Sequence, residues 1–117
     1  PDEKLFYLAD TGDPKDITVF DVSDDGKTLA NRRQFAEVRP GASDGIRVDE
    51  QGNIWTSARD GVQCYSPEGT LLGKMLIPEQ STANLTFGDK DGKRIYICGD
   101  TSLYSVRVKV AGAARYW

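Results

Sequence analysis

Apolar and polar residues alternate in short runs along most of this chain, which is the pattern of β-strands and not of helices. In residues 53–58, for example, Ile54 and Thr56 share one face while Trp55 and Ser57 share the other, as in a sheet that is packed on both sides. The runs are separated by pairs of an acid or amide and a glycine, which suit tight turns: Asp25-Gly26, Gln51-Gly52, Glu68-Gly69 and Asp91-Gly92. We therefore predict an all-β fold.

The predicted strands fall into three units along the chain. The middle unit is the most complete, with strands at residues 44–49, 53–58, 61–66 and 70–76. The first unit has strands near residues 4–9, 16–22 and 28–36, and the last has strands near 83–88, 93–98 and 102–108. The first unit lacks an inner strand, which would precede Pro1, and residues 109–117 show no clear fourth strand for the last.

Similar sequence segments recur at a spacing of about 40 residues, from Gln51 to Asp91 and from Ser23 to Ser66. Short strands at this period are typical of the blades of a β-propeller. The blade segments are predicted at about 1–36, 44–77 and 83–110. Because a propeller usually has 4–8 blades, three partial or complete blades do not close a ring. We predict that residues 1–117 are the C-terminal part of a propeller domain, which needs N-terminal blades or a second copy to close.

Composition narrows the range of partners. The chain is 38% hydrophobic and 28% charged, with a net charge of −3, which argues against a nucleic-acid partner. We interpret Arg107, Lys109 and Arg115 as solvated charges at the edge of the sheet. No apolar run approaches the ~20 residues that cross a bilayer, so no membrane partner is expected. We expect a cytoplasmic protein; a periplasmic or secreted one stays open, because Pro1 stands where an initiator Met would be.

Catalytic chemistry is limited by the absence of histidine from the sequence. These residues alone therefore form no Ser–His–Asp triad, no Cys–His pair and no His-ligated zinc site. Cys64 and Cys98 both lie in apolar strand patterns, and we predict that both are small buried hydrophobic residues. Carboxylates, amides, Arg, Lys and Tyr are left as candidates for chemistry.

Four sequence segments, in this order along the chain, resemble motifs of a known protein family: residues 7–11, 43–49, 52–57 and 83–88. From Pro1 to about Val110, the chain resembles the C-terminal half of the senescence marker protein/gluconolactonase/luciferin-regenerating enzyme-like family. The resemblance implies a six-bladed propeller that binds a divalent cation in its central channel, most often Ca²⁺, with Zn²⁺ or Mg²⁺ as alternatives. It also implies hydrolysis of a small-molecule sugar lactone, as in a gluconolactonase.

The resemblance assigns Asp44 as both a metal ligand and the catalytic proton acceptor and donor, with the other ligands upstream of Pro1. Without the family resemblance, the segment Ser43-Asp44-Gly45 would be interpreted as an ordinary turn leading into a strand. A carboxylate at the mouth of an inner strand nevertheless suits a hard cation such as calcium, which prefers oxygen ligands. Asn84 stands 40 residues later at the same repeat position; it is a candidate substrate-binding residue or a cap of its strand.

Other carboxylates and aromatic residues carry less weight. We interpret Asp10 and Asp49 as turn or edge carboxylates, and the aromatic residues Tyr7, Trp55 and Tyr96 as packing between blades. Two alternatives to a metal-dependent lactonase remain open, namely a paraoxonase- or strictosidine-synthase-like esterase and a non-enzymatic propeller that binds proteins. What separates the lactonase from the binding scaffold is whether a channel-facing Glu and Asn join Asp44.

Overall fold

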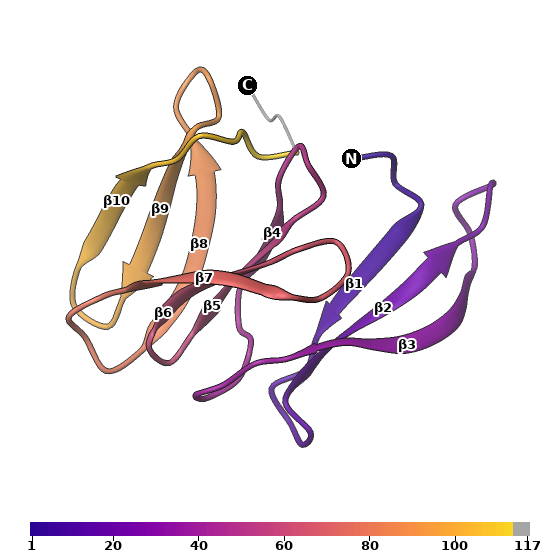
Figure 1. The fold of residues 1–117 in the computed structure, drawn as a ribbon, viewed down its shortest axis with the longest axis horizontal. Coiled ribbons are helices and arrows are strands. Elements are labelled where there is room, and N and C mark those ends of the chain that lie inside the picture. The colour runs from indigo at the N-terminus through magenta and orange to yellow at the C-terminus, as the bar shows by residue number, and fades with distance from the viewer. Residues whose placement is uncertain (114–117) are drawn as a thin grey trace.

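The computed structural model describes residues 1–113 and shows ten strands in three antiparallel sheets, with no helix among those residues (Figure 1). The first sheet consists of β1 (Leu5–Ala9), β2 (Asp16–Val22) and β3 (Leu29–Glu37). The second contains β4 (Ile46–Val48), β5 (Ile54–Ala58), β6 (Gly61–Tyr65) and β7 (Leu71–Leu76). The third contains β8 (Thr82–Gly88), β9 (Arg94–Gly99) and β10 (Leu103–Arg107). The predicted all-β fold is confirmed, and no described segment is a helix suited to spanning a bilayer.

The turns between strands form where the acid-or-amide plus glycine pairs predicted them. Gly52 and Gly92 have φ values of 82° and 66°, which a residue without a Cβ adopts easily. Their amides donate to the carbonyls of Asp49 and Asp89, each at 3.0 Å, and so close the β4–β5 and β8–β9 turns. The local chemistry of these pairs therefore fixes the ends of neighbouring strands.

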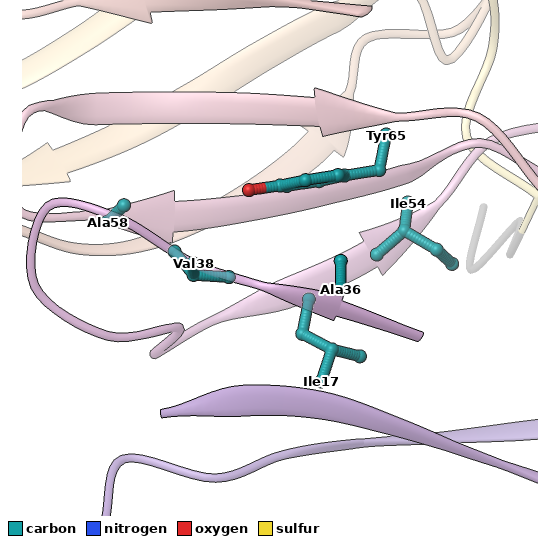
Figure 2. Close-up of a cluster of buried hydrophobic side chains, with 6 residues drawn as sticks. All are labelled: Ile17, Ala36, Val38, Ile54, Ala58 and Tyr65. Carbon is teal, nitrogen blue, oxygen red and sulfur yellow. The ribbon is translucent and has the colours of Figure 1, made fainter. Parts of the chain in front are cut away.

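The sheets pack face to face, each against its neighbour. Figure 2 shows the apolar cluster between the first and second sheets, made of Ile17, Ala36, Val38, Ile54, Ala58 and Tyr65. A second cluster joins the second and third sheets and consists of Val62, Leu85, Phe87, Ile95 and Ile97. Beside it, Trp55 meets Phe87 edge to face at a centroid distance of 5.9 Å, which confirms the predicted packing role of Trp55. Side chains that alternate between two neighbouring sheets are what blades of a propeller require.

The two end sheets leave apolar side chains in solvent. Leu5, Phe6 and Leu8 on β1 are 42–46% exposed, and Leu103 on β10 is 68% exposed. After β10 the chain turns back toward β4, where the Ala113 amide donates to the Val48 carbonyl at 2.8 Å. The described part of the last sheet therefore has three strands, and residues 114–117, which include Arg115, lie outside the described residues.

One expectation from the sequence is wrong, and another needs refinement. Cys98 is exposed, whereas Cys64 is buried as predicted. On β9, Ile95 and Ile97 face the second sheet, and the alternate positions such as Cys98 face away from it. Of the two settings predicted for Asp49, the turn is right and the edge is not: its side chain accepts from the turn amides of Gln51 and Asn53, but it is fully buried, and its two carboxylate oxygens accept four hydrogen bonds in all.

Candidate functional site

Asp44 lies in the loop that leads into β4, with its side chain exposed. The strand was predicted to begin at residue 44, but it begins two residues later. The turn is nevertheless held to β5, because the Asp44 amide donates to the Ser57 carbonyl at 3.1 Å and the Gly45 amide donates to Ser57 Oγ at 2.8 Å. The main chain on both sides of the Asp44 carboxylate is thus fixed while the carboxylate itself is free to meet a ligand.

Asn84 is the third residue of β8, and the structure brings it next to the Asp44 turn. A Cβ placed on Gly45 would overlap Asn84 Oδ1 and would lie 3.1 Å from Asn84 Cα. Glycine is therefore required here by the close approach of the two inner strands. The Asn84 Oδ1 atom also accepts a hydrogen bond from the Leu85 amide at 2.8 Å. Both predicted site residues lie at the starts of neighbouring inner strands, which contact each other.

Buried hydroxyl groups support this corner of the molecule, and the sequence analysis did not identify them. Ser43 Oγ and Thr56 Oγ1 lie 2.6 Å apart, and both residues are fully buried. Ser57, also fully buried, contacts the Ala83 carbonyl on β8 at 3.2 Å. The signal in the sequence is the presence of small hydroxyl residues at strand positions where the pattern predicts core side chains.

A cavity of about 960 Å³ lies toward the other end of β4. Its walls come from the N-terminal residues and β1, from β4 and the β4–β5 turn, from β8, and from Gly112 and Ala113. Arg47 on β4 lines this cavity and donates from Nη1 to the Ile46 carbonyl at 2.7 Å. Neither Asp44 nor Asn84 lines it, so this cavity is distinct from the predicted site.

The described residues supply only part of a cation site. Within residues 1–113 no group of three or more His, Cys, Asp or Glu side chains is arranged to hold a metal ion. Calcium takes 6–8 oxygen ligands, and the exposed Asp44 carboxylate is a suitable hard donor for one or two of those positions. The donor chemistry therefore fits a divalent cation at Asp44, provided that other segments complete the shell.

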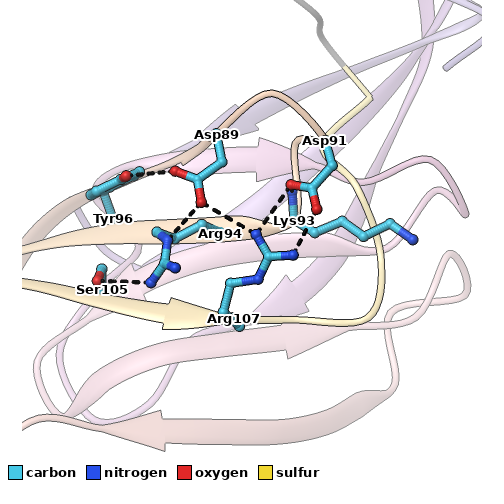
Figure 3. A network of polar contacts seen from close by, with 7 residues as sticks. All are labelled: Asp89, Asp91, Lys93, Arg94, Tyr96, Ser105 and Arg107. Carbon is cyan, nitrogen blue, oxygen red and sulfur yellow. Dashed lines mark hydrogen bonds and ion pairs between the residues drawn. The ribbon is translucent and has the colours of Figure 1, made fainter.

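The charged loop at the β8–β9 turn is a structural network and not a cation site (Figure 3). Asp89 accepts hydrogen bonds from Arg94 Nε and the Tyr96 hydroxyl, both at 2.7 Å, and Arg107 bridges it to Asp91. The Arg94 guanidinium, followed by the Tyr96 hydroxyl, lowers the pKa of the Asp89 carboxyl. The Arg107 guanidinium likewise lowers the pKa of Asp91. Both carboxylates are already neutralised by arginines, and Arg107 is an exposed edge residue as predicted.

Comparison with known proteins decides the family. The model of the SMP-30/Gluconolactonase/LRE-like region matches residues 1–101. The chain belongs to this family. It is 31% identical over 122 residues to a gluconolactonase of Zymomonas mobilis, covering 96% of this chain and 34% of that protein. It is 30% identical over 138 residues to the lactonohydrolase oryH of Aspergillus oryzae, covering 97% of this chain and 29% of that protein.

Solved structures agree with the fold. A gluconolactonase from Xanthomonas campestris superposes with a TM-score of 0.82 at 34% identity, covering 96% of this chain and 35% of that one. The calcium-binding protein regucalcin from Agrobacterium tumefaciens superposes with a TM-score of 0.81 at 17% identity, covering 96% of this chain and 44% of that one; this likeness concerns the fold alone. The predicted propeller architecture is confirmed, and the chain spans about a third of the length of the curated relatives it matches.

Proposed function

We propose that the protein containing this chain hydrolyses a sugar lactone, with Asp44 as the residue that carries the proton. The observation that carries this proposal is the close approach of Asn84 to Gly45, the residue that follows Asp44, near the starts of two inner strands. The names of the relatives support the substrate class: they include a gluconolactonase, a lactonohydrolase and a pentonolactonase. A cytoplasmic location remains a prediction from the sequence.

Lactone hydrolysis needs a water made nucleophilic and a proton delivered to the departing ring oxygen. The exposed Asp44 carboxylate can accept the proton from a water within hydrogen-bond reach and return it to that oxygen. Because Asn84 Oδ1 already accepts from the Leu85 amide, the Asn84 Nδ2 group is the donor left for a sugar oxygen. A divalent cation, most simply calcium, would be held in part by Asp44 and would supply polarisation of the lactone carbonyl and a lower pKa for a bound water.

Activity of the complete polypeptide tests this proposal most directly. We expect turnover of gluconolactone and of a pentonolactone in a pH-stat, its loss with EDTA, and its return with calcium. Asp44→Asn should lower kcat by about 10²- to 10⁴-fold, the range for loss of a general acid–base, while the circular dichroism spectrum is unchanged. Asp10→Asn is the matched control, because this carboxylate is also exposed and lies after another strand.

Two results would contradict the proposal. Full activity of Asp44→Asn would remove Asp44 from the mechanism. No turnover of any lactone by the folded polypeptide would instead favour the non-enzymatic propeller as a protein-binding scaffold.

A further inference from the structure

We propose that Ser57 is a positioning residue that sets the relative placement of Asp44 and Asn84. This inference rests on the proposed function, because it assigns a role to Ser57 in the same site. Ser57 is fully buried on β5, so it does not meet a substrate itself. Its role follows from the groups that it joins.

Main-chain and side-chain hydrogen bonds hold the Asp44 turn to Ser57. The Ser57 carbonyl accepts from the Asp44 amide at 3.1 Å, and the Ser57 amide donates to the Gly45 carbonyl at 2.9 Å. The third bond uses the side chain: Ser57 Oγ accepts from the Gly45 amide at 2.8 Å. A hydroxyl is needed for this bond, since the Gly45 amide is buried and would otherwise lose its partner.

The same hydroxyl also reaches the strand that carries Asn84. Ser57 Oγ is 3.2 Å from the Ala83 carbonyl and 3.4 Å from the Gly45 carbonyl, and it can donate its single proton to the nearer of the two while it accepts from the Gly45 amide. The pairing of β8 with β9 is irregular between Thr82 and Asn84, so Ala83 is the extra residue at this point. Such a bulge redirects the neighbouring side chain. Ser57 therefore binds the Asp44 turn on one side and the bulge beside Asn84 on the other.

Comparison of the second and third sheets shows that a buried serine is not required at every equivalent position. The pair of the third sheet that matches Gly45 and Ser57 is Asn84 and Cys98, since in each sheet the next pair, Ile46–Thr56 or Leu85–Ile97, faces the preceding sheet. Cys98 is exposed, whereas Ser57 is fully buried and the side-chain amide of Asn84 lies against Gly45. The buried hydroxyl thus distinguishes the second sheet from the third, at the corner where both candidate site residues lie.

The test compares Ser57→Ala with a matched control, Thr18→Val, in the complete polypeptide. Thr18 is a buried residue on β2 whose hydroxyl, among residues 1–113, bonds only to the Asp16 carboxylate, at 3.4 Å. We expect Ser57→Ala to lower kcat for gluconolactone and the affinity for calcium alone, measured by calorimetry, by about 10- to 100-fold, as for groups that orient ligands. The Gly45 amide should also exchange with deuterium faster. Thr18→Val should change none of these three readouts, even if both variants lower the melting temperature.

If Ser57→Ala does not fold, Ser57→Cys is measured in its place, because a thiol has a size similar to that of the serine hydroxyl and forms weaker hydrogen bonds. Values of kcat and calcium affinity within twofold of wild type in both Ser57 variants would overturn the positioning role. Activity retained in Asp44→Asn would overturn the proposed function instead, and the exchange of the Gly45 amide would still report on the hydrogen bond of Ser57. The two failures are thereby distinguished.

Discussion

Replacing Asp49 by asparagine should destabilise the protein much more than the same replacement at Asp10, although both carboxylates follow strands in the sequence. Asp49 is fully buried, and one oxygen accepts from the main-chain amides of Gln51 and Asn53, both at 2.9 Å. The other accepts from Asn53 Nδ2 at 2.9 Å and from Trp55 Nε1 at 2.8 Å. Asp10 is exposed and accepts one bond, from the Gly12 amide at 2.9 Å.

The magnitude follows from the number of donors. Asparagine keeps one oxygen of Asp49 and turns the other into an NH₂ group, which then faces two N–H donors and loses both bonds. Each buried donor left without a partner costs ~1–3 kcal/mol, so with two such donors we expect the free energy of unfolding to fall by about 2–6 kcal/mol. In Asp10→Asn the remaining oxygen still accepts from Gly12, and the change should stay within ~0.5 kcal/mol.

Urea unfolding of the two variants and the wild type, followed by tryptophan fluorescence, measures this difference. The slope of the transition should stay the same, so that a shift of the midpoint reports stability. The fluorescence should respond at the site itself, since Trp55 is one of the four donors. Equal midpoints for Asp49→Asn and Asp10→Asn would refute the reasoning, because they would show that the buried carboxylate contributes nothing beyond an exposed one.

Two further predictions concern side chains away from the proposed site. A thiol reagent should label Cys98 fast and Cys64 slowly. Cys98 is exposed, whereas burial, followed by the nearby Asp49 charge, raises the pKa of Cys64 to about 12. Cys98→Ser should therefore remove one fast-reacting thiol per chain, and a similar loss in Cys64→Ser would contradict this prediction. Because the Arg94 guanidinium lowers the pKa of Asp89, this carboxylate stabilises the fold above its unfolded pKa of about 3.9, and that stability is lost as the pH falls through its folded pKa. The melting temperatures of wild type and Asp89→Asn should thus differ near neutral pH and converge in acid; a constant difference would argue against the ion pairs.

Strand positions and turns were predictable from the sequence because they depend on local patterns. The alternation in residues 53–58 and the glycine after Gln51 each act within a few residues, and the structure confirms both. The burial of Asp49 was not predictable in this way. It depends on the indole of Trp55 reaching back six residues and on a bridge between Asp49 and Gly112 from the far end of the chain.

The exposure of Cys98 shows a second limit of predicting burial from the alternation of apolar and polar residues. An apolar alternation shows that side chains point to opposite faces, but not which faces are covered. Ile97 packs against the second sheet, while Cys98 points away from it. Which face of an end sheet is covered is therefore a property of its neighbours and not of its own sequence.

The site was predictable to the extent that it follows the repeat. The 40-residue spacing predicted equivalent positions for Asp44 and Asn84, and the structure shows both near the starts of inner strands. The exact counterpart of Asn84 is however Gly45, one residue after Asp44, because Ile46 and Leu85 are the residues that face the preceding sheet. The repeat did not show that Asn84 lies against Gly45, the residue after Asp44, because this close approach depends on the missing Cβ of Gly45. A residue that exchanges protons must be reached by solvent and yet be held in place. Here both demands are met together, because Gly45 has no Cβ and lets Asn84 approach, while the buried Ser57 hydroxyl holds the turn beside the exposed Asp44 carboxylate. A glycine and a buried hydroxyl residue beside an exposed carboxylate at the start of an inner strand are therefore the signal in the sequence that locates such a site.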